Sequence, residues 1–283
     1  MNSDRTTDDQ AATSGTQPPC RLFDAHCHLQ DDRLVSRIDA VMERATQAGV
    51  TTMMCCGTRE SDWLVVAEIA GRFAGVRMSF GLHPWHVATR TATWLDTLQK
   101  LLRDHPAAVG EIGLDHAMGP ETFAAQEDVF LAQLSLAVER DRPVSVHCRR
   151  AWGRMMELLD NHGWPPRGVM FHSYSGGPGL VPALVRRGAW FSFSGSITHD
   201  KNLRGREAIA IVPKERLLME TDAPDIMPAI PEPKSHLHFL RHAPVNEPAN
   251  LTHIAATIAR LRDWTTDQTA AITHRNAETF FPL

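Results

Sequence analysis

Two histidines close to the N-terminus, His26 and His28, have the spacing of paired metal ligands. Side chains two positions apart face the same way wherever the backbone is extended. The residues before the pair, 22–25, are largely apolar and favour such a strand. Neutral imidazole is a common ligand of divalent ions, so the pair indicates a metal site, although short histidine pairs also arise by chance.

Further candidate ligands follow apolar segments elsewhere in the chain: Glu111, His147, His172 and Asp222. Taken singly, each histidine is more often a hydrogen-bonded core residue than a ligand, and Glu220 and Asp222 alone could cap a strand end. With the first pair they make six candidates, too many for one tetrahedral zinc that keeps an open position. They suit two divalent ions sharing one carboxylate, which together can activate water and polarise a phosphoryl or carbonyl oxygen.

The chain has eight short apolar segments, separated by longer segments of helical pattern, and five of the eight contain or precede these residues. The expected strands are 22–25, 50–56, 76–80, 107–112, 144–147, 169–172, 189–193 and 217–222. The expected helices are 38–48, 62–73, 93–103, 121–140, 152–162, 179–187, 204–212, 249–261 and 266–278.

This alternation predicts the fold class α/β, because parallel strands need crossover connections. Eight such units can close into a (β/α)₈ TIM barrel, a single domain whose site lies at the C-terminal ends of its strands. The six candidates would then meet at one mouth. An open doubly wound sheet is the alternative, but no Gly-x-Gly-x-x-Gly follows the first strand to support it.

Composition narrows the possible partners. The 283 residues are 43% hydrophobic, which suits one large core, and the net charge is −4. A protein that grips long duplex DNA along a whole face would normally be more basic, so any nucleic acid is expected to be held locally. No apolar run approaches the ~18 residues of a membrane span, and no obligate protein partner is evident.

The first twenty residues are expected to form a disordered tail that precedes a barrel over residues 21–283. They are rich in Asp, Thr, Ser, Gln and Pro and lack the apolar stretch of a signal peptide. The five cysteines are odd in number and show no paired spacing, which argues against a disulfide framework. We therefore expect a cytoplasmic protein.

Several motifs, in their order along the chain, resemble those of the TatD family of metal-dependent hydrolases, in the amidohydrolase superfamily. The resemblance runs from about residue 22 to residue 281. The matching segments are 23–28 (FDAHCH), 81–84 (GLHP), 110–115 (GEIGLD), 146–149 (VHCR), 171–176 (FHSYSG), 220–224 (ETDAP) and 246–248 (NEP). Each is weak to moderate alone, and their number and order make the signal strong.

The resemblance implies two divalent ions, with Zn, Mn, Mg, Co and Fe not distinguishable from one another. It also implies their ligands: His26, His28 and Asp222 for the first ion, His147 and His172 for the second, and Glu111 as the bridge. Asp222 would in addition orient the attacking water. Deprotonation of that water by Asp222 is a further role that the resemblance leaves open. Asp115 would brace the site from behind. Glu111, Asp222 and His83 are the expected catalytic residues.

The resemblance implies a substrate contact from His83, to phosphate. A second contact is expected from Arg149, for which a surface position at a helix start is the alternative. The chain departs from the family pattern in two places near these residues. Trp85 stands where the family often has a second histidine. Residues 225–228 (DIMP) replace the usual aromatic residue and basic stretch, which leaves substrate preference open.

The resulting hypothesis is a metal-dependent hydrolase, a TatD-type deoxyribonuclease that cleaves phosphodiester bonds, expected at single-stranded DNA ends. The first alternative is an amide, ester or lactone hydrolase or an aminoacyl-tRNA deacylase on the same barrel, since activated water also attacks carbonyl carbon. A non-enzymatic metal-binding interaction protein is the second alternative, but it predicts loss of ligands, and all six are present. The substrate is therefore expected to be DNA or a small phosphoester or ester.

Overall fold

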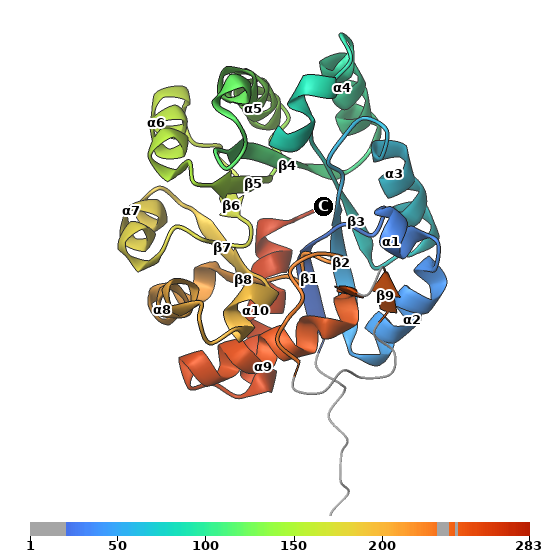
Figure 1. Ribbon diagram of the computed structural model, residues 1–283, viewed down its shortest axis with the longest axis vertical. Helices are drawn as coiled ribbons and strands as arrows, with labels where there is room; N and C mark the ends of the chain where they lie inside the picture. The colour runs from blue at the N-terminus through green and yellow to red at the C-terminus, as the bar shows by residue number, and fades with distance from the viewer. Residues whose placement is uncertain (1–20, 231–237, 241–242) are drawn as a thin grey trace, which may run out of the picture.

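A computed structural model of the chain describes residues 21–230, 238–240 and 243–283 (Figure 1). The expected disordered tail, residues 1–20, lies outside the described residues. Eight strands form one sheet in sequential order, and every hydrogen-bonded pair of neighbours is parallel. They are β1 (Leu22–Cys27), β2 (Val50–Cys56), β3 (Val76–Phe80), β4 (Ala107–Asp115), β5 (Val144–Arg149), β6 (Val169–Phe171), β7 (Trp190–Phe193) and β8 (Leu217–Met219).

Helices surround this sheet in Figure 1, and the strands lie inside the ring that they form. They are α1 (Asp32–Val35), α2 (Ile38–Gln47), α3 (Trp63–Arg72), α4 (Trp94–Asp104), α5 (Phe123–Glu139), α6 (Trp152–His162), α7 (Val181–Arg186), α8 (Leu203–Ile211), α9 (Leu251–Arg262) and α10 (Thr266–Phe280). Their sequence pattern explains why they pack there. In α2, for example, Ile38, Val41, Met42 and Ala45 recur at helical spacing and are buried.

The barrel closes between the first strand and the segment that follows β8. Asp222 donates its backbone N–H to the carbonyl of His26 at 3.0 Å, and His28 donates to the carbonyl of Ala223 at 2.7 Å. The buried carboxylate of Asp24 accepts the backbone N–H of Thr221 at 2.8 Å and its hydroxyl at 2.5 Å. These contacts join the two ends of the sheet, and the predicted TIM barrel is confirmed.

Two apolar layers hold the barrel together. The larger lies between the strands and the surrounding helices. The smaller contains Phe23, Met54 and Met170 from the strands together with Phe280 and Phe281 from the end of the chain. The rings of Phe23 and Phe281 stack with centroids 6.2 Å apart, so the C-terminal segment contributes directly to this smaller core.

The expected strands and helices match the structure closely. The short helix α1 was not expected, and β4 continues to Asp115, beyond its expected end at residue 112. The last strand was expected over 217–222 but ends at Met219, because Glu220 and Thr221 turn to side-chain and loop contacts and Asp222 adopts a φ of +55°. No strand was expected in the proline-rich segment after it. It contains a short antiparallel pair, β9 (His238–Leu240) and β10 (Ala243–Val245).

Candidate metal centre

Glu111 is the carboxylate around which the site is built, and two glycines bring it there. It lies on β4 between Gly110 and Gly113, whose φ angles are +154° and +147°. A Cβ at Gly113 would lie 1.9 Å from the carbonyl oxygen of His147, and a Cβ at Gly110 would lie 2.7 Å from the Cβ of Ser145. The glycines therefore allow β4 to approach β5 closely enough to place Glu111 beside the histidines of neighbouring strands.

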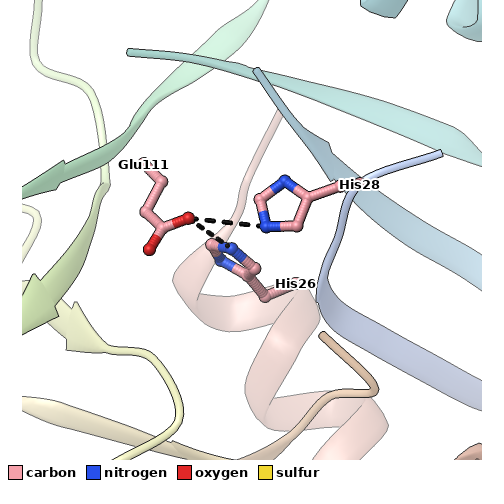
Figure 2. Close-up of side chains that lie close together, drawn as sticks. All are labelled: His26, His28 and Glu111. Atoms are coloured by element: carbon pink, nitrogen blue, oxygen red, sulfur yellow. Dashed lines mark hydrogen bonds and ion pairs between the residues drawn. The ribbon is translucent and has the colours of Figure 1, made fainter. Parts of the chain in front are cut away.

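One carboxylate oxygen of Glu111 faces the histidine pair from β1 (Figure 2). Glu111 Oε2 lies 3.2 Å from Nε2 of His26 and 3.5 Å from Nε2 of His28. Asp222 completes this side, because its Oδ1 lies 3.4 Å from Nε2 of His28 and 3.9 Å from Nε2 of His26. All four side chains are largely buried, so their polar atoms face one another rather than bulk water.

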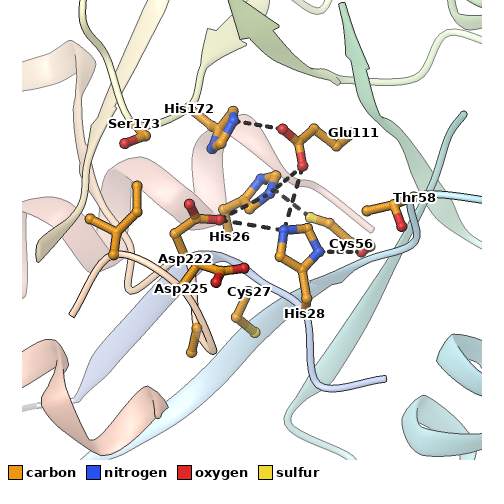
Figure 3. Close-up of polar contacts among 12 residues, drawn as sticks. His26, Cys27, His28, Cys56, Thr58, Glu111, His172, Ser173, Asp222 and Asp225 are labelled. Atoms are coloured by element: carbon orange, nitrogen blue, oxygen red, sulfur yellow. Dashed lines mark hydrogen bonds and ion pairs between the residues drawn. The ribbon is translucent and has the colours of Figure 1, made fainter. Parts of the chain in front are cut away.

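The other oxygen of Glu111 faces histidines from three further strand ends. Glu111 Oε1 lies 2.7 Å from Nε2 of His172, 2.9 Å from Nδ1 of His147 and 3.2 Å from Nε2 of His83. The two oxygens thus face two different groups of ring nitrogens, as a carboxylate between two ions would. The two groups of histidines are not fully separate. His172, which faces Oε1, also lies with His26 and Asp222 in a group that could hold an ion (Figure 3).

In the two histidines of the first pair, the ring nitrogen that points away from Glu111 meets a partner on another strand. Nδ1 of His28 donates to the carbonyl of Cys56 at 2.8 Å, and Nδ1 of His26 lies 3.0 Å from Oγ of Ser145. This outer hydrogen bond fixes the ring and leaves the inner nitrogen with a lone pair when the ring is neutral. A ring held in this way is preorganised as a metal ligand.

Buried carboxylates take the same outer position at the other two histidines. Nε2 of His147 lies 3.3 Å from Asp115, and Nδ1 of His172 lies 3.4 Å from Glu220. Within the described part of the chain, Nδ1 of His172 and Oε2 of Glu220 have no hydrogen-bond partner. Nδ1 of His172 faces Glu220 and not the other candidate ligands, so the fit of the site to a metal ion rests on its donor set of imidazoles and carboxylates.

The protonation of the cluster reflects its crowding. Burial opposes the charge on Glu111, yet the charges of His172 and His83 hold its pKa well below the usual range. Burial also opposes the charge on His28, but the hydrogen bond to Asp222 and the charge of Glu111 raise its pKa to about 9. Burial lowers the pKa of His83 to about 4. A divalent cation bound among these acids and rings would compete with protons for the same atoms.

An open cavity of about 640 Å³ lies over this cluster. Arg149 lines it, is 56% exposed, and lies 3.8 Å from the carboxylate of Asp115. Arg33 also lines it and is held by Asp31 and by Asp225, which follows Asp222 closely in the chain. The cavity therefore has acids and rings at its floor and guanidinium groups at its rim, which suits an anionic substrate of limited size.

The structure brings together all six side chains predicted to bind metal, and it places His83 and Arg149 at the same cavity. His83 lies deeper than expected of a substrate contact, since it touches Glu111 directly. Asp115 contacts His147 as the resemblance implied. The sequence did not reveal the outer partners Ser145 and Glu220, since a residue's neighbour on another strand depends on register.

Comparisons with known proteins agree with this geometry. The chain matches the family described as TatD related DNase over residues 23–282. It is 32% identical to the 3'-5' ssDNA/RNA exonuclease TatD of Shigella flexneri, covering 93% of this chain and 99% of that protein. It is also 32% identical to the uncharacterized metal-dependent hydrolase YjjV of Escherichia coli K12, with 93% and 98% coverage.

Solved structures show the same fold. The crystal structure of YjjV, a TatD homolog from Escherichia coli K12, superposes with a TM-score of 0.83 at 30% identity, over 93% of this chain and 99% of the other. A TatD family hydrolase from Entamoeba histolytica superposes with a TM-score of 0.79 at 19% identity, over 92% and 98%. Among the described residues, none of the helices combines the length and hydropathy needed to cross a bilayer.

Proposed function

The chain belongs to the family of TatD-related DNases and is a metal-dependent hydrolase of ester bonds, and from this premise we propose that it removes nucleotides from the ends of single-stranded DNA. The relatives named 3'-5' ssDNA/RNA exonuclease support this substrate class. The observation that carries the proposal is the division of ring nitrogens between the two oxygens of Glu111. That arrangement suits two ions and the phosphodiester chemistry that two ions support.

In this proposal His26, His28 and Asp222 would hold one ion, His147 and His172 the other, and Glu111 both. When bound, such ions activate water and offset the negative charge that develops on phosphoryl oxygens. The protein's own contribution is to fix the rings through their outer hydrogen bonds and to exclude bulk water from the cavity floor.

Three side chains would handle the substrate and the proton. Asp222, which lines the cavity, would orient the attacking water and accept its proton. His83 would contact the phosphate as a neutral ring, in keeping with its lowered pKa. Arg149, exposed at the rim, would pair with a neighbouring phosphate.

The substrate is proposed to enter as a single strand or as a small phosphoester. The cavity is local rather than a groove, and the net charge of −4 offers no broad basic face. A reducing compartment such as the cytoplasm is proposed on separate grounds: the four cysteines in the described part of the chain are free and buried.

The test couples metal analysis of purified protein to hydrolysis of end-labelled single-stranded DNA, with a panel of lactones and acyl esters in parallel. We expect shortening of the DNA that depends on Zn, Mn, Mg, Co or Fe, and no turnover by Glu111→Ala. Activity confined to the carbonyl substrates would reject the proposed nuclease and support the alternative, an amide, ester or lactone hydrolase. A metal-loaded protein inactive on every substrate would favour a binding role.

A further inference from the structure

An exposed tryptophan stands at the rim of the metal cavity. Trp85 follows the buried His83 in the turn Pro84–Thr89, lines the cavity and is 53% exposed. Exposing an indole costs solvation free energy that a packed position would avoid. Five large hydrophobic side chains are exposed in the described ranges: Leu64, Trp85, Val138, Leu203 and Ile211. Of these five, Trp85 alone lines this cavity.

The ring is held in place although it is exposed. Its indole N–H donates to Oδ2 of Asp115 at 2.7 Å, and its backbone N–H donates to Nδ1 of His83 at 3.1 Å. Asp115 is itself fully buried and contacts His147. A hydrogen bond to a buried carboxylate fixes the plane of the indole, so a flat partner would find the ring preorganised.

The Trp85 ring lies directly beside His83 and the candidate ligand His147. The centroid of the Trp85 ring lies 4.9 Å from that of His83 and 6.4 Å from that of His147, both edge to face. The indole therefore stands beside the cluster rather than over it. A phosphate at the cluster would carry its base, one sugar away, toward this ring.

Charge around the ring fits the same ligand. Arg59 and Arg149 line the cavity, and both are exposed. A nucleotide combines an anionic group with a flat π-face, and guanidinium groups beside an aromatic ring recognise that combination. A purely aliphatic ester would use neither.

We propose that Trp85 is a stacking platform for the base of the nucleotide whose phosphate lies at the metal centre. This inference rests on the proposed function and adds a base-recognition subsite to it. Stacking is tolerant of base identity, since every base has a π-face. The subsite therefore distinguishes a nucleotide from an abasic sugar phosphate without selecting a sequence.

The test compares the binding of dAMP and of 2-deoxyribose 5-phosphate by calorimetry in the metal-loaded protein and in Trp85→Phe and Trp85→Ala. The wild type should bind dAMP about tenfold more tightly than the sugar phosphate. Trp85→Phe should keep most of this preference, and Trp85→Ala should lose it. Equal affinities in the wild type would overturn the platform.

The two variants also separate stacking from support of Asp115. Both remove the indole N–H, so a role limited to holding Asp115 would make them equally defective for both ligands, and that result would overturn the proposal. Leu64→Ala, which removes an exposed side chain outside the cavity, is the matched control and should bind like the wild type.

Hydrolysis of oligonucleotides ending in a normal or an abasic nucleotide distinguishes the failure of this inference from the failure of the proposed function. Wild-type cleavage of both ends at equal kcat/KM would reject the platform and retain the nuclease. A wild type that cleaves neither end but binds dAMP tenfold better than the sugar phosphate would reject the nuclease and retain the platform.

Discussion

The two ends of the barrel are built from the same strands but from opposite kinds of side chain. Inside the sheet, Phe23 and Met54 pack with Phe280 and Phe281 and leave no polar group to satisfy at those positions. At the carboxyl ends of the strands, rings and acids gather around Glu111. The packed apolar side chains at one end make the strands rigid. That rigidity holds the rings and acids in fixed positions at the other end.

The largest expected effect on catalysis comes from a substitution of Asp222, at the polar end of the barrel. Asp222→Asn keeps the size of the side chain but removes its capacity to accept a proton, so kcat should fall by about 10²–10⁴-fold at saturating metal. The melting temperature should change little. Steady-state kinetics and thermal melting check this, and a variant with wild-type kcat would remove Asp222 from the reaction.

At the opposite end, Phe281→Ala should lower the stability of the fold without changing the catalytic rate. Phe281 is fully buried and stacks on Phe23, so its removal should lower the free energy of unfolding by about 3–5 kcal/mol. Denaturant titration measures this. At a temperature where the variant is folded, kcat and metal content should match the wild type, and loss of metal would show that the two ends are not separable.

A smaller effect is expected from the residues that hold the ligands from outside. Asp115→Asn keeps the shape but weakens the contact to His147, so metal affinity should fall by about 10–100-fold. Competition with a chelator measures this change. Excess metal should restore activity, whereas a defect that no metal concentration relieves would assign Asp115 a different role.

Arg149 should give the smallest effect, because its side chain is 56% exposed. If it pairs with a substrate phosphate, Arg149→Ala should raise KM by about tenfold or less and leave kcat near the wild-type value. The increase should shrink at high salt, where exposed charges are screened. Unchanged KM at low salt would show that Arg149, at the end of β5, does not contact the substrate.

The two ends also differ in how far the sequence predicted them. The strands were expected at the right places, since β2 and β3 were predicted with their observed bounds and most others within two residues. Such segments are fixed by local apolar pattern and by the turns around them. The role of Phe280 and Phe281 in the inner core was not predicted, because it depends on where the last helix docks.

At the polar end, residue type and position after a strand were enough to predict the six candidate ligands that the structure brings together. The partners behind them were not, because the contact of His26 with Ser145 joins residues 119 positions apart and depends on the register between strands. Trp85 stood out as a departure from the family pattern. Its hydrogen bond to Asp115, which fixes the indole beside the cavity, could not be predicted from the sequence because it depends on the folded structure.

The most direct measurement of the central claim is the number of divalent ions bound per chain at saturation, by elemental analysis after removal of free metal. The account predicts two ions in the wild type, one in a His26→Ala/His28→Ala double variant, and none retained in Glu111→Ala. A wild type that binds a single ion, or a Glu111→Ala variant that still holds two, would contradict the assignment of Glu111 as the shared ligand.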